Sequence, residues 1–249
     1  MPRISVVIPA YNEEHRLPAT LYSVCDYFCA RGDDFEVVVV DDGSQDQTAA
    51  VVESCAAKYK QVRLLSYQPN QGKGHAIRTG ILSAKGDLLL IDDADGSSPI
   101  EEIERLLPGI ESGADIVIGS RAKPDKERKV EALTHRKVIG NTFNAIVQRL
   151  LLPGLYDTQC GFKLFKRDAA VDIFSTSRIK GYGFDVEVLY IARLRGYNTA
   201  EVAINWHNVG GSKVNVLTDS PRMFIEVLKI WFSGAIGHYK SPAPRPDKA

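Results

Sequence analysis

Short apolar runs alternate with longer, helix-like stretches from the start of the chain to about residue 120. The apolar runs are rich in β-branched residues, which indicates strands that are buried on both faces. Such alternation is typical of a parallel sheet covered by helices on both sides, so the sequence predicts an α/β fold with a mostly parallel sheet. Pro9 is expected to end the first strand. The expected strands are 4–8, 36–40, 62–66, 88–91 and 115–119, and the expected helices are 17–30, 46–59, 75–84 and 100–110.

The second half of the chain is less regular. We expect a helix at 135–151, a loop entering a strand at 154–165, a helix at 184–195 and a strand at 199–205. This pattern predicts one α/β domain over residues 1–218, followed by an amphipathic helical segment over 219–240. The proline-rich end, 241–249, is expected to be disordered.

Composition sets limits on the partners and the compartment. The formal net charge is zero, and 44% of the residues are hydrophobic, so overall charge predicts no nucleic-acid partner and the chain can form a sizeable core. No apolar run approaches the length of a membrane span, and a strand begins too early for a signal peptide. The cysteines form no CxxC pair and are expected to be buried thiols of a reducing compartment, which predicts a cytoplasmic protein. They are Cys25, Cys29, Cys55 and Cys160.

Polar side chains follow successive strands of the predicted sheet. Because ligands of parallel sheets bind at the carboxyl ends of the strands, we expect these side chains to form one site. They are Tyr11, Glu13, Asp41, Asp42, Lys73, Asp93, Asp95 and Arg121.

The stretch GDLLLIDDADGSSP, residues 86–99, carries the most specific signal in this group. Asp93 and Asp95 follow a buried strand and are one residue apart, and carboxylate oxygens are ligands that Mg²⁺ or Mn²⁺ prefers. Ser97 offers a further oxygen. A metal ion held there could carry a diphosphate. The alternative is a polar strand-end turn in which aspartate and serine side chains cap the next helix.

Other nucleotide-binding motifs are missing. The first strand is followed by PAYNEE where a dinucleotide-binding fold would show GxGxxG, and NQGKGHA does not match GxxxxGK[ST]. The glycine-rich phosphate loop of sugar nucleotidylyltransferases is missing as well. A nucleotide held by aromatic and acidic side chains, with its diphosphate on a metal ion, is the interpretation that remains.

Four motifs, VVIPAYNEE, VVVDDGSQD, NQGKGHA and IDDADG, resemble in order and spacing the opening motifs of family 2 glycosyltransferases with the GT-A fold. The stretches DTQCGFKLF, GYGFDVEVLYIARLRGY and NWHNVGGSKVNVLTDSPRM resemble the dolichyl-phosphate β-glucosyltransferase branch of that family, which is related to dolichyl-phosphate mannosyltransferases. The resemblance extends to about Trp231.

This resemblance implies metal-dependent transfer of a hexose, with glucose favoured, from a nucleotide sugar such as UDP-glucose to a polyprenyl or dolichyl phosphate. The anomeric carbon would be inverted. Three alternatives remain open. They are mannosyl transfer from GDP-mannose, transfer to a hydroxyl acceptor by an enzyme of the same fold, and a catalytically silent module that binds sugar nucleotides.

The resemblance also implies roles for individual residues at the donor site. Asp93 and Asp95 would hold the metal ion, with Asp95 also catalytic, and Ser97 stands where the family often has glutamine. Lys213 would place a positive charge on the far side of the diphosphate. The residues expected to contact the nucleotide sugar are Pro9, Tyr11, Glu13, Asp42, Lys73, Asp93, Ala94 and Lys213; Lys73 could instead lie in solvent.

The acceptor needs a separate argument. A phosphate monoester has a second pKa of about 6 and is largely dianionic at pH 7, so it needs cations and no general base. Arg121 and Arg136 are the candidates by resemblance, and an arginine pair matches phosphate geometry. The alternative is that each arginine makes a surface ion pair. Asp157 is the candidate catalytic base for a hydroxyl acceptor; with a phosphate acceptor it would orient an arginine, a lysine or the sugar.

The stretch 222–239 predicts an amphipathic helix. Arg222, Glu226, Lys229 and Ser233 fall on one narrow polar stripe, and apolar residues including Trp231 cover the rest. A wide apolar face with aromatic residues indicates a helix that lies on a membrane surface, which would make the enzyme peripheral on the cytoplasmic face. The alternatives are packing on the domain core and a contact in a homo-oligomer.

Overall fold

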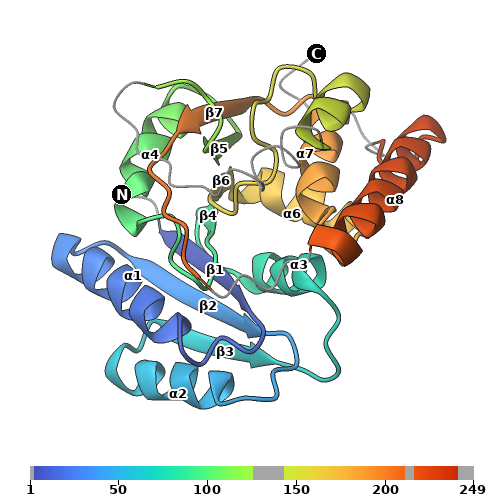
Figure 1. Cartoon of the computed structure of the whole chain (residues 1–249). Coiled ribbons are helices and arrows are strands. Elements are labelled where there is room, and N and C mark those ends of the chain that lie inside the picture. Colours follow the sequence, from blue (N-terminus) through green and yellow to red (C-terminus); the bar gives the residue numbers. More distant parts are fainter. Residues whose placement is uncertain (1–2, 126–142, 211–215, 241–249) are drawn as a thin grey trace.

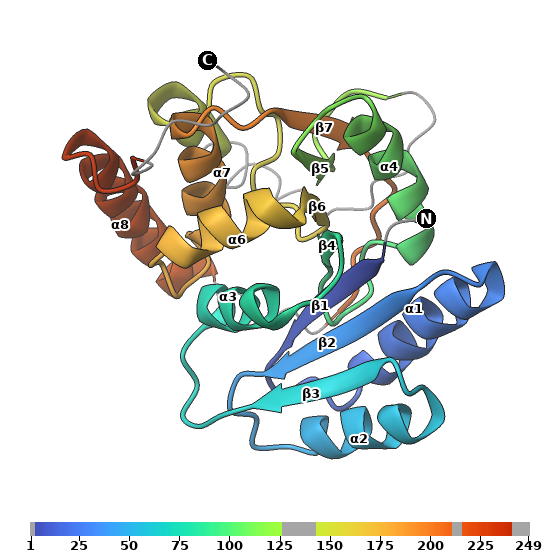
Figure 2. The same ribbon diagram turned by 180° about the vertical axis from the view of Figure 1, so that it is seen from behind.

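The computed structural model describes residues 3–125, 143–210 and 216–240, with side chains described from 221 onward in the last range. Seven strands form a single sheet in the order β3-β2-β1-β4-β6-β5-β7, in which only β6 runs antiparallel to its neighbours (Figures 1 and 2). The predicted mostly parallel α/β sheet is therefore confirmed. The strands are β1 (Ile4–Ala10), β2 (Phe35–Asp41), β3 (Val62–Ser66), β4 (Leu88–Ile91), β5 (Ile116–Ser120), β6 (Lys163–Lys166) and β7 (Thr199–Ala203).

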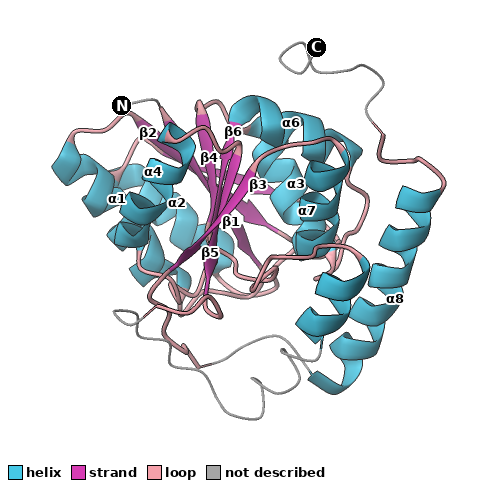
Figure 3. Cartoon of the chain, turned by 90° about the horizontal axis from the view of Figure 1, so that it is seen from above, coloured by secondary structure: helices cyan, strands magenta, loops and turns pink. Residues whose placement is uncertain are grey.

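Helices cover both faces of this sheet and create two separate cores. Helices α1, α2 and α4 lie on one face, and α3, α6 and α7 lie on the other (Figure 3). In β2, Val37 and Val39 enter the first core while Val38 and Val40 enter the second, which explains why this strand is nearly pure valine. The helical elements are α1 (Leu17–Arg31), α2 (Thr48–Lys58), α3 (Lys73–Ser83), η1 (Ile100–Glu102), α4 (Ile103–Glu111), α6 (Arg167–Thr176), α7 (Phe184–Leu194) and α8 (Val216–Ala235).

Pro9 does not end β1 as expected, because it pairs in register with Val40. Strand β4 pairs with β1 only as far as Val7, whose carbonyl accepts a hydrogen bond from the Asp92 N–H. Since alternate residues of a strand direct their backbone groups to the same side, Pro9, like Val7, faces the β4 side of β1. Strand β4 has already ended at this level. The missing N–H of proline therefore leaves no broken ladder bond.

Two features of the second half differ from expectation or were missed. Strand β6 lies between β4 and β5 and runs antiparallel to both, and helix α6, which follows it directly, was left unassigned.

The cysteines differ from expectation at one position. Cys29 is exposed rather than buried, while the other three cysteines are buried as expected.

The C-terminal helix α8 begins earlier than expected and lies on the outer side of α7, away from the sheet (Figures 1 and 3). Within the described ranges, no helix combines the length and apolar character that a membrane span requires. Of the helix expected at 135–151, residues 143–150 are helical as predicted, and residue 151 is a turn. Residues 135–142 and the tail 241–249 lie outside the described residues. The division of the chain at residue 218 stays a prediction.

Candidate active site

The loops that follow β1 and β2 are joined by hydrogen bonds at the carboxyl end of the sheet. The N–H of Asn12 donates to Ser44 Oγ at 2.9 Å, and the N–H of Gln45 donates to Asn12 Oδ1 at 2.8 Å. The N–H of Glu13 donates to Thr48 Oγ1 at 2.8 Å. Residues that are more than 30 positions apart in sequence thus form one surface, as the position of their strands predicted.

Asp42 shapes the next loop of this surface. Its buried carboxylate accepts hydrogen bonds from the side-chain amide of Asn70 at 2.9 Å and from the N–H groups of Gln71 and Gly72, both at 2.8 Å. Gly43 has a φ of 76°, and a β-carbon there would lie 2.7 Å from the backbone nitrogen of Asn70. Asp42 therefore fixes the loop that leads into Lys73, and its contact with a nucleotide stays a prediction.

Lys73 and Asp93 form the ion pair at the centre of the site. Lys73 Nζ lies 2.6 Å from Asp93 Oδ1, so this lysine does not extend into solvent. Burial alone would raise the pKa of Asp93, but the positive charge of Lys73 holds that pKa below its ordinary value. On its other side Asp93 packs against Gly161, where any β-carbon would overlap the carboxylate.

Asp95 lies beside a second ion pair, which was not predicted. Arg16 donates from Nε and Nη2 to the two carboxylate oxygens of Glu13, with Nε 2.7 Å from Oε2. The same guanidinium lies 3.6 Å from Asp95 Oδ2, and Asp95 Oδ1 accepts the N–H of Ser97 at 3.0 Å. Glu13 is thus paired with Arg16. In the DxD motif, Asp93-Ala94-Asp95, Asp95 is the less tightly paired carboxylate, although 33% of the Asp93 side chain is exposed against 24% for Asp95.

Arg121 and Asp157 form a two-pronged ion pair. Arg121 Nε lies 2.7 Å from Asp157 Oδ2, Nη2 lies 3.0 Å from Oδ1, and the Arg121 N–H also donates to Oδ2 at 3.0 Å. Although burial alone would raise the pKa of Asp157, the charge of Arg121 lowers it to about 2. The guanidinium also lies over the ring of Trp206, 5.5 Å from its centre. Asp157 therefore engages Arg121 with both oxygens, and its role in the reaction stays a prediction.

Lys163 and Asp185 make a buried pair behind these groups, and sequence reasoning missed it. The Lys163 side chain is fully buried and donates to both the Asp185 carboxylate and the Cys160 carbonyl. Its charge also helps to lower the pKa of Asp93 and of Asp157. The site thus contains the ion pairs Lys73–Asp93, Lys163–Asp185 and Arg121–Asp157. A lysine between apolar neighbours in a strand was the only available signal.

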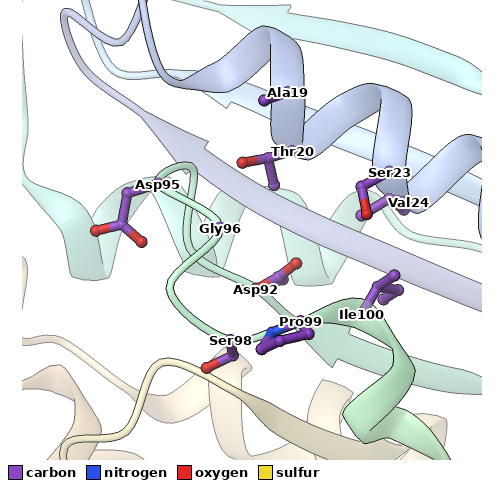
Figure 4. A pocket seen from close by; sticks show the side chains of 10 residues that line it. All are labelled: Ala19, Thr20, Ser23, Val24, Asp92, Asp95, Gly96, Ser98, Pro99 and Ile100. Atoms are coloured by element: carbon purple, nitrogen blue, oxygen red, sulfur yellow. The ribbon is translucent and has the colours of Figure 1, made fainter. Parts of the chain in front are cut away.

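A small pocket of about 230 Å³ lies behind the DxD loop, between that loop and α1 (Figure 4). Asp92 and Asp95 both line it, but they leave the loop in different directions (Figure 4). Burial and the charges of Asp93 and Asp95 raise the pKa of Asp92 well above its ordinary value. Asp92 is therefore set apart from the two carboxylates that were expected to bind metal.

Of the two predicted metal ligands, Asp93 is paired with Lys73 at 2.6 Å, whereas the contact of Asp95 with Arg16 is longer, at 3.6 Å. Among the described residues there is no group of three or more histidine, cysteine or acidic side chains arranged to hold an ion. Mg²⁺ needs less than that, because it often binds one or two carboxylates together with substrate phosphates and water. The oxygen donors of Asp95 and Asp93 fit such a shared site, while the Ser97 carbonyl accepts the N–H of His207 at 2.9 Å.

The remaining predicted residues are placed as follows. Pro9 is half-buried, Tyr11 is exposed at the rim, and the Ala94 carbonyl accepts the Thr20 hydroxyl at 2.9 Å. Lys213 and Arg136 lie outside the described residues, so their roles stay predictions.

Comparison with solved structures defines the class of the fold as GT-A glycosyltransferase. Mannosyl-3-phosphoglycerate synthase from Rubrobacter xylanophilus superposes with a TM-score of 0.71 at 18% identity, covering 100% of this chain and 78% of that one. Glucosyl-3-phosphoglycerate synthase from Mycobacterium tuberculosis, in complex with Mn²⁺ and UDP-glucose, gives 0.68 at 20% identity, covering 92% and 79%.

Sequence comparison gives the family. The model of the family described as "Glycosyl transferase family 2" matches residues 5–174. Human dolichyl-phosphate beta-glucosyltransferase is 40% identical over 225 residues, which are 85% of this chain and 69% of the relative. The Saccharomyces cerevisiae protein of the same name is 35% identical over 258 residues, covering 95% and 76%. The chain is a glycosyltransferase and belongs to glycosyl transferase family 2.

Gly161→Ala should lower the turnover number by about 100-fold, because the added β-carbon displaces Asp93 and a shift of about 1 Å costs that much. Gly210→Ala is the matched control, since a β-carbon there meets nothing within 4 Å. Steady-state kinetics and thermal melting of both variants make the test. Full activity in Gly161→Ala would show that the position of Asp93 is not critical.

The Arg121–Asp157 pair should make stability depend on pH in acid. Because the pKa of Asp157 is depressed to about 2, its contribution is fully present above about pH 4 and is lost as the pH falls through about 2. Urea unfolding of wild type and Asp157→Asn should differ by a pH-dependent part of about 2 kcal/mol that disappears over this range. A difference that stays constant would contradict the assignment. Asp168→Asn, at an exposed site, is the control.

Proposed function

We propose that this glycosyltransferase transfers glucose from UDP-glucose to dolichyl phosphate or another polyprenyl phosphate, with inversion at the anomeric carbon. The names of the relatives at 34 to 40% identity support the acceptor and the sugar. The Mycobacterium tuberculosis enzyme of the same fold, with UDP-glucose and Mn²⁺ bound, is consistent with the donor.

The observation that carries the phosphate acceptor is the state of Asp157. A hydroxyl acceptor needs a general base, and such a base works best with a pKa near the operating pH. Asp157 has both oxygens on Arg121 and a pKa of about 2, so it is a poor base. A phosphate acceptor is already anionic and needs cations. Arg121, rigidly held and followed along the chain by Arg136, suits that acceptor.

The donor diphosphate would lie against the DxD loop. Asp95, with Asp93 beside it, would hold Mg²⁺ or Mn²⁺, and when bound this ion neutralises charge that develops on the departing diphosphate. Lys73 fixes the position of Asp93, and Arg16 holds Glu13 next to Asp95. Pro9, Tyr11 and Asp42 would contact the base and ribose, and Lys213 would approach the diphosphate from the other side.

A polyprenyl phosphate is anchored in a bilayer, whereas the nucleotide sugar is dissolved. We therefore place the enzyme at the cytoplasmic surface of a membrane, as a peripheral protein. A homo-oligomer is compatible with this arrangement.

Labelled UDP-glucose should transfer its sugar to polyprenyl phosphate only when a divalent cation is present. GDP-mannose should be a poor donor, and donor hydrolysis without acceptor should be slow. Asp95→Asn should reduce transfer by about 100-fold or more, because it weakens stabilisation of the departing diphosphate. The exposed substitution Asp168→Asn should have no effect. Near-normal turnover in EDTA would contradict the metal site, and faster transfer from GDP-mannose would contradict the sugar.

Removing an acceptor arginine should weaken acceptor binding and leave donor binding nearly unchanged. Arg136→Ala tests one partner. Arg121→Ala is best combined with Asp157→Asn, so that no buried carboxylate is left without its cation. A charged hydrogen bond is worth roughly 1.5–3 kcal/mol, so the acceptor KM should rise about 10- to 150-fold. Loss of donor affinity with unchanged acceptor KM would reverse the assignment; Asp157→Asn alone is the control.

A further inference from the structure

Helix α8 turns a continuous row of large apolar side chains to the outside. Six of them are between 42% and 63% exposed, whereas other exposed large apolar residues in the described ranges are spread over several elements. Single exposed apolar residues are ordinary, but a row on one helix marks an interaction surface. The row, called here the outer face of α8, consists of Phe224, Ile225, Leu228, Trp231, Phe232 and Ile236.

The opposite side of the helix is fixed to the domain. Val227 and Ile230 are fully buried in the core that α7 also enters, and Gly234 lies against the ring of Tyr190. Glu226 points inward and accepts the N–H of Gly183 at 2.8 Å. The apolar surface of this helix therefore divides in two: one part packs on α7 and the other, the outer face, is left for a partner (Figures 1 and 3).

The charges around the outer face are positive. Among residues 221–240, the exposed charged side chains are Arg222, Lys229 and Lys240, and the one acid, Glu226, is directed at Gly183. Arg222 and Lys229 are seven positions apart, so they line the same edge of the apolar row, next to Ile225 and Phe232. An apolar band containing tryptophan and phenylalanine, edged by basic side chains, matches an anionic lipid surface.

We propose that the outer face of α8 binds the surface of an anionic lipid bilayer, with the helix axis in the plane of the membrane. Its six apolar side chains enter the acyl boundary, and Arg222 and Lys229 contact lipid phosphates. This membrane contact deepens the proposed function, because it would bring the site to a lipid acceptor. Only that purpose rests on the proposed function; the binding itself does not.

The inner side of α8 is linked by a chain of contacts to the loop that precedes Lys73. Gly183, held by Glu226, belongs to the loop 177–183, and the Lys180 carbonyl of that loop accepts the N–H of Gly74 at 2.8 Å. Gly74 follows Lys73, which pairs with Asp93. A membrane bound at α8 would therefore contact an element that is connected to the proposed donor site.

Vesicle flotation tests the surface without any acceptor present. The full chain should float with vesicles of phosphatidylcholine and phosphatidylserine that contain no polyprenyl phosphate. The triple change Phe224→Ser, Trp231→Ser and Phe232→Ser should weaken binding by about 100-fold or more. The matched control, Leu82→Ser, Val171→Ser and Leu194→Ser, removes three exposed apolar side chains elsewhere and should float like wild type. Circular dichroism should show all variants folded.

The basic edge gives a second, independent measurement. The double change Arg222→Ala and Lys229→Ala should reduce binding to phosphatidylserine vesicles by about 25-fold, since each basic residue near an anionic surface contributes a factor of about five. Binding of wild type to pure phosphatidylcholine should be correspondingly weaker, and the double variant should no longer distinguish the two vesicle types.

Two results would overturn the proposal. One is wild type that stays in the soluble fraction with anionic vesicles. The other is a wild-type dimer that the triple serine variant converts to monomer, with no flotation, which would assign the outer face to a second copy of the chain. Transfer to a short, water-soluble polyprenyl phosphate without vesicles tests the proposed function separately. Transfer without flotation would contradict only the membrane-binding role of α8. Flotation without transfer would contradict only the proposed polyprenyl phosphate acceptor.

Discussion

The site depends on neutralising carboxylates that a buried sheet brings together. Asp93, Asp157 and Asp185 would repel one another and resist burial if they were alone. Each has a cation from a different part of the chain: Lys73 at the start of α3, Arg121 after β5, and Lys163 in β6. Since breaking a buried pair leaves an uncompensated charge, the positions of these elements and the geometry of the site are set together.

This pairing also explains why the two carboxylates expected to bind a metal ion are held to different degrees. Asp93 lies between Lys73 and Gly161, which restrict the movement of its carboxylate. Among the described residues, Asp95 accepts a hydrogen bond from the Ser97 N–H and makes a longer contact with Arg16. An incoming cation would find one carboxylate already oriented and a second that needs little rearrangement, which is what preorganisation requires.

The sequence was informative where a property is local. Apolar runs located the strands of the first half, and polar residues directly after them located one edge of the sheet, because both depend on neighbours along the chain. Contacts between distant segments could not be predicted. The antiparallel β6, the ion pair of Arg16 with Glu13, the contact of Gly161 with Asp93 and the buried Lys163–Asp185 pair depend on which segments meet. No spacing rule encodes those meetings.

Helix α8 also shows that sequence pattern alone does not give the contacts between distant segments. Its amphipathic pattern predicted a polar stripe of four residues, but the structure divides that stripe: Glu226 faces the domain and Arg222 and Lys229 face outward. Glu226 holds one end of the loop 177–183, and at the other end Glu187 accepts the N–H groups of Arg178 and Ile179 and the hydroxyl of Tyr239. The segment 226–239 thus contacts one end of this loop directly and the other through Glu187, and the Lys180 carbonyl of the loop accepts the N–H of Gly74. Hydrogen bonds through this loop therefore connect the outer helix with the first turn of α3, which carries Lys73.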